Sequence, residues 1–564
     1  MSVRDPKKGV DSTPPRFSNG AIAAELMTLA QLLGARGANP FKVKAYRRAA
    51  KTIKALSESV DDLVRRGADL TVYPAIGPAI AGVIEEIVKT GKLRRTETLR
   101  TELKPEILEL AQYPHLDPRR VKRIYKKFNI SSIAGLKEKL ESGEVAAKLG
   151  VRMAQHIRQG LSPSQEMLLY EADRIVPPIQ MFLIERCGVR RAKPAGDYRR
   201  RVEIIREISF LIETDDFRSV LKGLQTYGGG AELLEENDTT AHLRLSTGIT
   251  LRITLADRKN WGTSLVLATG SGQHLRQLPE TVKEASTEAG VYRQFGLAFI
   301  PPELREGHDE IALAAGGQPL ELVSASDIIG ELHAHTTASD GANTIEEMAE
   351  AAKERGYDYV GISDHSQSLK IAHGLSEEEL WEQIRFIDRL NERLAGIRVL
   401  KSAEVDILAD GSLDYSKDLL KALDYTICSI HSRFGFGKTE QTERILRAMD
   451  NRYFSILGHA TGRLLLKRPG YEIDIERIVE HASATGCSFE INSSPDRLDL
   501  SADHARLARQ AGIKIAITTD AHSIHEFRYL QYGVDQARRA GLPKSMILNH
   551  LPWLQLGKTF KERS

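Results

Sequence analysis

Seven segments between Gly330 and Ser523 have the composition of buried strands, and each ends at a histidine or an acidic residue. A helical segment follows each of them, and strict strand–helix alternation predicts a parallel sheet. Chemically active side chains at the carboxyl ends of such strands are typical of a barrel with its active face there. We therefore predict an α/β barrel with seven units, distorted from the common eightfold form. The expected strands are 330–335, 359–364, 399–406, 425–431, 454–459, 488–492 and 513–520.

The strand endings contain nine candidate metal ligands. They are His333, His335, Asp340, His365, Glu404, His431, His459, Asp520 and His522. His333 and His335 are two residues apart on a strand, so both imidazoles point to the same face. At about three to four ligands per ion, nine donors suffice for two or three divalent metals, with Glu404 as a candidate bridge. Histidine combined with carboxylate favours Zn²⁺ or Mn²⁺ over Mg²⁺ or Ca²⁺.

The alternative is that these side chains only satisfy hydrogen bonds at the strand ends. That interpretation is preferable for any one of them, but not for nine at successive strand ends. Metal ions about 3.5–4 Å apart typically hold the attacking and leaving oxygens of a phosphoester displacement. The expected chemistry is therefore phosphoester hydrolysis.

Charge is distributed unevenly along the 564 residues. Residues 1–160 carry 30 Lys and Arg against 17 Asp and Glu, whereas the remainder carries 49 against 59. A basic front region joined to an acidic rear region indicates a polyanionic partner, although a solvated surface would look similar. Three separated cysteines and the absence of a long apolar run favour a cytoplasmic protein with no membrane partner. We expect a monomer of roughly three or four domains.

A short turn between two helical segments is the first candidate DNA contact. The segment Tyr73–Ala81 (YPAIGPAIA) resembles a helix-hairpin-helix, in which the backbone near Ile76, Gly77 and Ala79 faces a phosphate. Glycine turns between helices also occur for structural reasons alone. Tyr113–Pro118 occupies the matching place of a second hairpin, but Asp117 disfavours phosphate there. Lys122 and Arg123 belong to the basic run that follows, which is either a DNA contact or a solvated helix face.

The pattern divides the chain into a helix-hairpin-helix region, an α+β region and the barrel. The expected boundaries are a disordered tail at 1–19, helical domains at 20–95 and 96–160, two α+β segments at 161–260 and 261–318, a linker at 319–328 and the barrel at 329–564.

Several motifs resemble known families. In the barrel, GELHAHT at 330–336, SDG at 339–341, SDHS at 363–366, EVDI at 404–407, SIH at 429–431, GH at 458–459 and TDAH at 519–522 resemble, in order, the motifs of the polymerase and histidinol phosphatase (PHP) domain. GSLDY at 411–415 and TGR at 461–463 resemble the version attached to bacterial family X DNA polymerases. FKVKAYRRAA at 41–50, TGS at 269–271 and IPPELRE at 300–306 resemble the N-terminal domain and thumb of that family. The resemblance implies that 161–260 is a degenerate palm, 261–318 a thumb and 96–160 a fingers-like domain. The likeness extends over nearly the whole chain from about residue 20.

The resemblance implies a metal-dependent 3′→5′ exonuclease in the PHP domain, beside a gap-filling polymerase. It implies one metal on His333, His335, Glu404 and Asp520, a second on Glu404, His431 and His459, and a third on Asp340, His365 and His522. Arg463 and Arg497 become candidate phosphate contacts, with ordinary salt bridges as the alternative.

The polymerase motifs depart from the family pattern. Asp197 stands where the family has a serine that touches the triphosphate, and its charge would repel that ligand. The metal-binding Asp-x-Asp pair becomes Glu207-Ile-Ser209, and Arg252 stands in place of the third aspartate. Two Mg²⁺ ions need these carboxylates for nucleotidyl transfer, so we predict an inactive polymerase site. The lyase lysine of the family falls at Val83; Lys51 or Lys54 could replace it only if the fold directs them inward.

The sequence thus predicts a DNA 3′→5′ exonuclease for DNA repair on a degenerate polymerase scaffold. It would act on gapped or 3′-ended duplex without sequence preference. Two other functions stay open: a polymerase that is still active, and a phosphomonoesterase for a small substrate.

Overall fold

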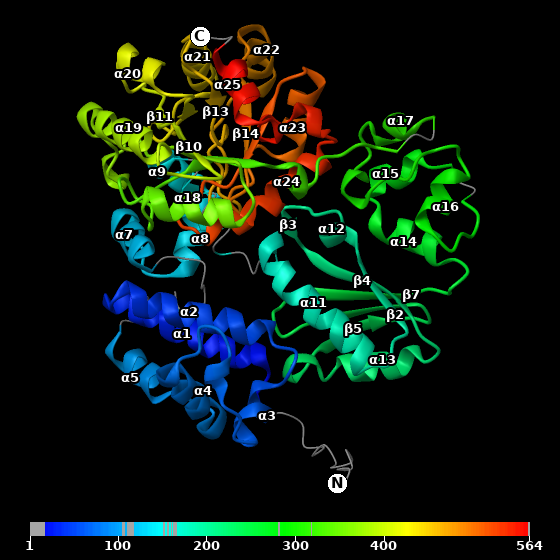
Figure 1. Ribbon diagram of the computed structural model, residues 1–564. Coiled ribbons are helices and arrows are strands. Elements are labelled where there is room, and N and C mark those ends of the chain that lie inside the picture. Colours follow the sequence, from blue (N-terminus) through cyan, green and yellow to red (C-terminus); the bar gives the residue numbers. More distant parts are fainter. Residues whose placement is uncertain are drawn as a thin grey trace, which may run out of the picture. The chain divides into compact units, whose positions relative to one another are not determined.

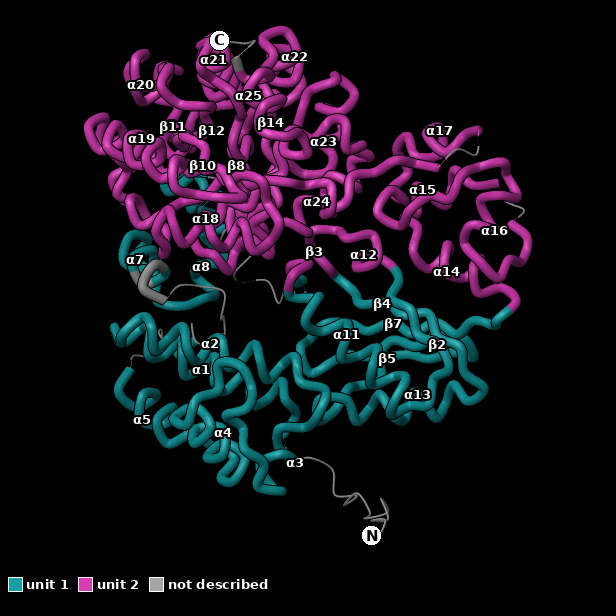
Figure 2. The backbone as a smooth tube through the Cα atoms, in the orientation of Figure 1, with its two compact units in different colours: residues 1–167, 171–195, 206–258 teal, residues 168–170, 196–205, 259–564 magenta. Residues whose placement is uncertain are grey.

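The computed structural model describes residues 17–103, 108–109, 118–150, 153–154, 157–158, 161, 166–279, 282–316 and 319–561. The chain forms two compact units, which Figure 2 colours separately. One unit contains residues 1–167, 171–195 and 206–258, and the other contains residues 168–170, 196–205 and 259–564. Within the described ranges, no helix has both the length and the apolar character needed to cross a membrane.

The N-terminal region is helical, as predicted (blue in Figure 1). Its elements are α1 (Asn19–Arg36), α2 (Pro40–Ala55), α3 (Val60–Arg65), η1 (Leu70–Val72), α4 (Pro78–Thr90) and α5 (Arg94–Glu102). Helix α1 begins inside the expected tail because the Ser18 hydroxyl accepts a hydrogen bond from the amide of Ala21. The apolar faces of these helices share one core that includes Ile22, Leu26 and Ile84.

Three further helices build a second small core. They are α7 (Pro118–Phe128), α8 (Ile133–Glu141) and α9 (Glu144–Leu149). The Ser132 hydroxyl caps α8 by accepting a hydrogen bond from the amide of Gly135, and Leu136 of that helix is fully buried.

A five-stranded mixed sheet occupies the expected palm. Its strands are β2 (Arg191–Ala195), β4 (Glu207–Glu213), β5 (Glu232–Glu236), β6 (Thr240–Arg244) and β7 (Thr250–Leu255), in the order β2-β4-β7-β6-β5. Strands β4 and β7 pair in parallel, and the other neighbours are antiparallel. Helices α11 (Leu169–Glu185) and α13 (Phe217–Leu224) and the turn η2 (Tyr227–Gly229) complete this region, and β1 (Met167–Leu168) pairs with β3 (Ile204–Ile205).

The expected thumb is a set of short helices in the second unit. They are α14 (Trp261–Thr269), α15 (Gly272–Gln277), α16 (Glu288–Arg293), η3 (Pro302–Leu304) and α17 (Glu310–Ala314). Helix α12 (Gly196–Arg199) comes from the expected palm but belongs to the same unit as these helices. Val266, Val291, Tyr292 and Ile300 are central to its core.

The C-terminal region is the predicted seven-unit barrel. Its strands are β8 (Gly330–Ala334), β9 (Tyr359–Ile362), β10 (Arg398–Lys401), β11 (Glu404–Asp406), β12 (Ile427–Ser429), β13 (Ile456–Leu457), β14 (Ser488–Asn492) and β15 (Ile515–Thr518). Every neighbouring pair is parallel, and a parallel bridge between Ala334 and Ala521 joins the last strand to the first. The third predicted strand is divided into β10 and β11 at Ser402 and Ala403, so the barrel is distorted at this point.

Helices surround the barrel strands (Figure 1). They are α18 (Ile345–Glu354), α19 (Glu377–Asn391), α20 (Lys417–Ala422), α21 (Lys438–Met449), α22 (Ile475–Thr485), α23 (Ala502–Gln510), α24 (Leu530–Arg539) and α25 (Trp553–Lys561). Short 3-10 turns are η4 (Ala325–Asp327), η5 (Lys370–Ala372), η6 (Glu526–Tyr529), η7 (Lys544–Met546) and η8 (Leu548–His550). Parallel strands buried by helices on the outside place their carboxyl ends at one face of the barrel.

Candidate metal centre

The nine candidate ligands come together at the carboxyl-terminal face of the barrel. They lie in β8 (His333), after β8 (His335, Asp340), after β9 (His365), at the β10–β11 break (Glu404), after β12 (His431), after β13 (His459) and after β15 (Asp520, His522). Most of these side chains are buried, whereas those of Asp340 and His522 are 35% exposed. The centre therefore has a buried end and an open end.

Glu404 lies in the middle of the cluster, and its two oxygens face different histidines. Its Oε1 is 2.9 Å from His459 Nε2 and 3.3 Å from His431 Nε2. Its Oε2 is 2.8 Å from His365 Nδ1 and 3.5 Å from His333 Nε2. A carboxylate that presents each oxygen to a separate group of imidazoles has the geometry of a bridge between two ions.

Asp520 completes the buried end. Its Oδ1 is 3.1 Å from His335 Nε2 and 3.6 Å from His333 Nε2, while its Oδ2 accepts a 2.9 Å hydrogen bond from the Asn492 side chain. One oxygen thus faces the imidazoles while the other is held by the protein.

Asp340 brings two histidines together at the open end. Its Oδ1 is 3.5 Å from His365 Nε2 and 3.4 Å from His522 Nε2. Across the described residues, the side chains converge in three overlapping groups, each with its donor atoms within 4.8 Å of one another. The groups are His335–Asp340–His365–His522, His333–His335–Asp520 and His365–Glu404–His431.

The donor set fits divalent metal ions. Five buried imidazole nitrogens make no hydrogen bond: Nε2 of His333, both nitrogens of His335, Nδ1 of His365 and Nδ1 of His459. Buried polar atoms are normally paired, so this concentration of unsatisfied lone pairs and N–H groups calls for another partner. Paired divalent ions would polarise a phosphoester and ionise water near neutral pH.

Against the opposing effect of burial, neighbouring carboxylates raise the pKa of His431 to about 10 and that of His522 to about 9. Glu404 and His335, in contrast, are kept in their metal-binding forms. Burial opposes ionisation of Glu404, but the surrounding His431, His365 and His333 hold the pKa of this carboxyl well below its ordinary value. Burial, together with the neighbouring His365 and His522, lowers the pKa of His335 to about 4. A carboxylate that stays ionised and an imidazole that stays neutral are the forms that bind metal.

Two carboxylates outside the predicted ligand set orient the histidines. Glu490 Oε1 is 2.6 Å from His333 Nδ1, and Asp406 Oδ1 is 2.8 Å from His431 Nδ1. Each contact leaves Nε2 of its histidine directed at Glu404, which is the usual role of an outer carboxylate at a metal site. The signal for Glu490 was present in the sequence, because it also lies in a strand that ends at the active face, but its role is to hold a ligand.

Glu331 and Asp364 hold the backbone of the ligand segments. Glu331 accepts hydrogen bonds from the amides of His333 and Thr519, next to Asp520. Asp364 accepts hydrogen bonds from the amide and hydroxyl of Thr336, next to His335. The centre is therefore held in place by buried hydrogen bonds around its ligands.

Comparison with known proteins agrees with this geometry. Residues 17–93 match the helix-hairpin-helix domain, and residues 331–494 match the PHP domain. Over 554 residues the chain is 33% identical to the DNA polymerase/3′-5′ exonuclease PolX of Bacillus subtilis (strain 168), covering 93% of this chain and 96% of that protein. The chain belongs to the PolX family.

Other relatives match a shorter part of this PolX chain, similar in length to the barrel. A probable phosphatase of Syntrophotalea carbinolica is 29% identical over 231 residues, which is 39% of this chain and 90% of that protein. A probable phosphatase of Thermoanaerobacter sp. (strain X514) is 30% identical over 234 residues, with the same coverage of both chains.

The palm of this PolX chain has a different electrostatic arrangement. Ser209 of β4 lies in register with Arg252 of β7, so a guanidinium occupies the strand position beside the serine. The Ser209 hydroxyl donates a 2.9 Å hydrogen bond to Glu207 Oε1, and His242 Nδ1 is 3.8 Å from Glu207 Oε2. Among the described residues, the groups of three or more converging metal-ligand side chains all lie in the barrel.

Asp197, in the second unit, belongs to a network of ion pairs. Its Oδ1 accepts a 2.6 Å hydrogen bond from Arg200, whose Nε also contacts Glu306 at 3.1 Å. The neighbouring Arg199 forms two hydrogen bonds, of 2.7 and 2.6 Å, with Glu288. The arginines of this segment thus have carboxylate partners within the protein.

The first hairpin is exposed at its tip. Ile76 is buried, whereas Gly77 and Ala79 are exposed at the N-terminus of α4. A Cβ at Gly77 would meet no atom within 4 Å, so this backbone is open to a ligand. Arg123 on α7 is also exposed, whereas the side chain of Lys122 and residues 111–117 of the second hairpin lie outside the described part of the chain.

The candidate lyase lysines lie at the end of α2. Lys51 Nζ is 2.6 Å from Glu171 Oε1, while Val83 packs partly buried against the helical core. Burial lowers the pKa of Lys54 from its ordinary value.

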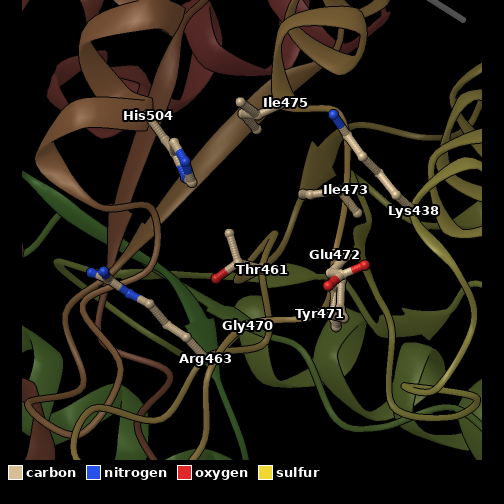
Figure 3. A pocket seen from close by; sticks show the side chains of 9 residues that line it. All are labelled: Lys438, Thr461, Arg463, Gly470, Tyr471, Glu472, Ile473, Ile475 and His504. Carbon is tan, nitrogen blue, oxygen red and sulfur yellow. The ribbon is translucent and has the colours of Figure 1, made fainter. Parts of the chain in front are cut away.

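The two candidate phosphate arginines differ in their surroundings. Arg463 forms an ion pair with Glu203, 2.6 Å between Nη2 and Oε1, which is the salt-bridge alternative. Arg497 is directed at the centre, with Nε 3.7 Å from Asp520 Oδ2. A cavity of about 350 Å³ lies beside Arg463, with Arg463 and His504 on one side and Lys438 on the other (Figure 3). None of the nine candidate ligands lines it.

Proposed function

We propose that this PolX chain is a metal-dependent 3′→5′ exonuclease that acts in DNA repair through its PHP centre. Its nucleotidyltransferase site would be inactive. Mn²⁺ or Zn²⁺ would occupy the centre, and the substrate would be gapped or 3′-ended duplex, bound without sequence preference by a monomer.

The observation that carries this proposal is the position of Glu404 among four imidazoles. Its two oxygens face separate groups, with His431 and His459 on one side and His365 and His333 on the other. Glu404 and these histidines would hold two divalent ions, which would supply the charge stabilisation that phosphodiester hydrolysis needs. The open end at Asp340 and His522 provides the approach for a strand terminus.

The residues of the chain then have distinct roles. Asp520, together with the histidines, would hold one ion, and Glu404 would be shared. Arg497, beside Asp520, would bind the phosphate of the terminal nucleotide as a fixed donor. Glu490 and Asp406 would keep His333 and His431 in the orientation that ligation needs.

Loss of the polymerase activity is supported by the palm. Nucleotidyl transfer needs carboxylates for two Mg²⁺ ions, and Arg252 instead brings a permanent positive charge next to Ser209. Asp197 would repel a triphosphate. The palm and thumb (161–260 and 261–318) would therefore act as DNA-holding domains, together with the helical domains at 20–95 and 96–160.

DNA binding would begin at the front helices. The exposed backbone of Gly77 and Ala79 at the start of α4 can donate hydrogen bonds to a phosphate, and Arg123 adds positive charge. Contacts of this kind do not read the base sequence, and they weaken as salt rises.

Two other functions have specific support. The Bacillus subtilis relative is named a DNA polymerase as well as an exonuclease, which favours a polymerase that is still active. The relatives that match a shorter part of the chain are named probable phosphatases, which favours hydrolysis of a small phosphomonoester.

One experiment separates the three functions. A 5′-labelled primer–template is incubated with the protein and Mn²⁺, with and without dNTPs, beside a His333→Ala/His335→Ala variant. We expect stepwise shortening from the 3′ end that does not depend on dNTPs and is absent in the variant. Extension by both proteins would instead show an active polymerase. Faster turnover of p-nitrophenyl phosphate than of the oligonucleotide would show a phosphomonoesterase.

A further inference from the structure

Residues 196–205 connect two strands of the palm sheet, yet they belong to the same compact unit as the barrel. Within this segment, Glu203 meets Arg463 of the barrel in a two-point ion pair. Arg463 Nη2 is 2.6 Å from Glu203 Oε1, and Nη1 is 3.3 Å from Oε2. The two side chains are only 18% and 19% exposed, so water screens the pair less than it would a surface pair.

Arg463 uses its remaining donors on the loop that follows β14. Its Nε donates a 3.0 Å hydrogen bond to the carbonyl of Arg497, and its Nη2 donates another to the carbonyl of Leu498. Leu498 has a φ of +44°, a left-handed conformation that a leucine adopts only when its surroundings hold it there. The Leu498 side chain is also buried in a cluster with Leu168 and Ile204.

The same loop reaches the metal centre on its other side. Arg497 Nε is 3.7 Å from Oδ2 of Asp520, and the side chain of Asn492, at the base of the loop, also binds that oxygen. Asp499 binds the amide and hydroxyl of Thr461, at 3.0 and 2.9 Å. A movement of the two carbonyls bound by Arg463 would therefore displace the guanidinium of Arg497.

We propose that Glu203 is a positioning residue for the PHP centre. It holds Arg463 against the carbonyls of Arg497 and Leu498, and this keeps the Arg497 guanidinium beside Asp520, where it meets the substrate phosphate. The polymerase-derived segment 196–205 thereby controls the geometry of the nuclease. The inference rests on the proposed nuclease function.

Removal of the Glu203 charge would allow Arg463 to move. The Arg463 guanidinium is mostly buried, and a buried charge without its carboxylate partner is unfavourable. It would therefore turn toward water or another anion. The cavity of about 350 Å³ bordered by Arg463 provides the space, and Glu472 also lines it (Figure 3). The two carbonyls then lose their donors and the loop loosens.

The test uses the full-length protein with the variants Glu203→Gln, Glu203→Asp, Arg463→Gln and the double variant Glu203→Gln/Arg463→Gln. The matched control is Glu303→Gln. Glu303 accepts a 2.9 Å hydrogen bond from Arg538, which also donates to the carbonyl of Val323. This pair is about as buried as Glu203 and Arg463, but it does not contact the 494–500 loop. Two quantities are measured. They are kcat and KM on a 5′-labelled primer–template with saturating Mn²⁺, and hydrogen–deuterium exchange of the 494–500 amides in the metal-free protein.

We expect Glu203→Gln to lower kcat by about tenfold, since small displacements of a phosphate-binding group have effects of at least this size. The 494–500 amides should exchange faster in Glu203→Gln than in the wild type. Both quantities should be nearer to the wild-type values in Glu203→Asp, and equal to them in Glu303→Gln. The double variant should be no slower than Arg463→Gln, because Glu203 acts only through that arginine.

The assignment would be overturned if Glu203→Gln had the same kcat and the same exchange rate at 494–500 as the wild type. It would also be overturned if the losses of kcat in the two single variants added up in the double variant. A wild-type protein without nuclease activity would refute the proposed function instead. The exchange measurement would still decide whether Glu203 holds the loop.

Discussion

Two edges of parallel strands in this molecule carry acidic residues, and they differ in what surrounds the carboxylates. In the barrel, Glu404 is 1% exposed and lies in a cluster where five buried imidazole nitrogens make no hydrogen bond. In the palm, the side chain of Glu207 is 33% exposed, accepts a hydrogen bond from Ser209, and lies on the strand next to Arg252. We expect a strand edge to bind a metal cation when its ligand side chains are not already balanced by positive charges of the protein. In the palm, we propose that Arg252 supplies that positive charge.

The comparison also concerns stability. Buried charges without partners are unfavourable, so the cluster around Glu404 is expected to depend on bound metal for part of its stability. The palm has no such dependence in this interpretation, because Arg252 supplies a permanent charge. Four measurements test this difference between the barrel and the palm.

The largest effect is expected for Glu404→Gln. The amide cannot bridge two cations, so exonuclease turnover should fall by more than about a hundredfold, the upper range for loss of a residue that only supports a ligand. The measurement is single-turnover digestion of a 5′-labelled strand, with metal content determined on the same sample. Retention of full activity and metal content would show that the barrel does not depend on this bridge.

Metal removal should destabilise the barrel but not the palm. With Mn²⁺ at about a thousand times its dissociation constant, a single site stabilises the folded state by about 4 kcal/mol. Calorimetry with Mn²⁺ and with a chelator should therefore show one transition that moves and another that does not. A chelator that shifted both transitions equally would contradict the contrast between the two regions.

Glu490→Gln tests the support around the ligands. It removes the carboxylate 2.6 Å from His333 Nδ1 while keeping the shape of the side chain. Metal affinity should fall by about 10- to 100-fold, with activity restored at higher Mn²⁺. Titration of Mn²⁺ against activity measures the shift, and an unchanged midpoint would mean that His333 does not need this partner.

The smallest effect is expected for Glu207→Ala in the palm. If this carboxylate has no metal-dependent role, exonuclease turnover should stay within about twofold of wild type, because exposed substitutions away from a site have small effects. Primer extension should be absent before and after the change. Extension by the wild type that disappears in Glu207→Ala would show an active polymerase site.

Much of the barrel could be predicted because its signals are local. Apolar runs that end at His333, His365, His431 or His459 identify strands and their functional ends from neighbouring residues alone, and all seven predicted strands are present. The break between β10 and β11 was not predicted. Residues 399–406 contain no glycine or proline that would signal a break, and only the pairing of Glu404 with Ile427 and of Arg398 with Tyr359 divides them between two sheets.

The ion-pair partners of charged side chains could not be predicted from neighbouring residues in the sequence. Arg463 was a candidate phosphate contact, and its carboxylate partner is Glu203, 260 residues away. Glu490 offers a ligand-type side chain at a strand end, yet it points its oxygen at His333 Nδ1 from a strand 157 residues later. A sequence shows which groups carry charge, but the folded chain decides which of them meet.

The sequence alone therefore determined the architecture, the family and the set of metal-binding residue types, because strand periodicity and motif order depend on neighbours along the chain. Only the tertiary structure decided that Glu404 lies between two groups of imidazoles, that Asp197 pairs with Arg200, and that Arg497 rather than Arg463 faces the centre. Electrostatic roles follow from distances of a few ångströms between residues far apart in the chain, and folding alone sets those distances.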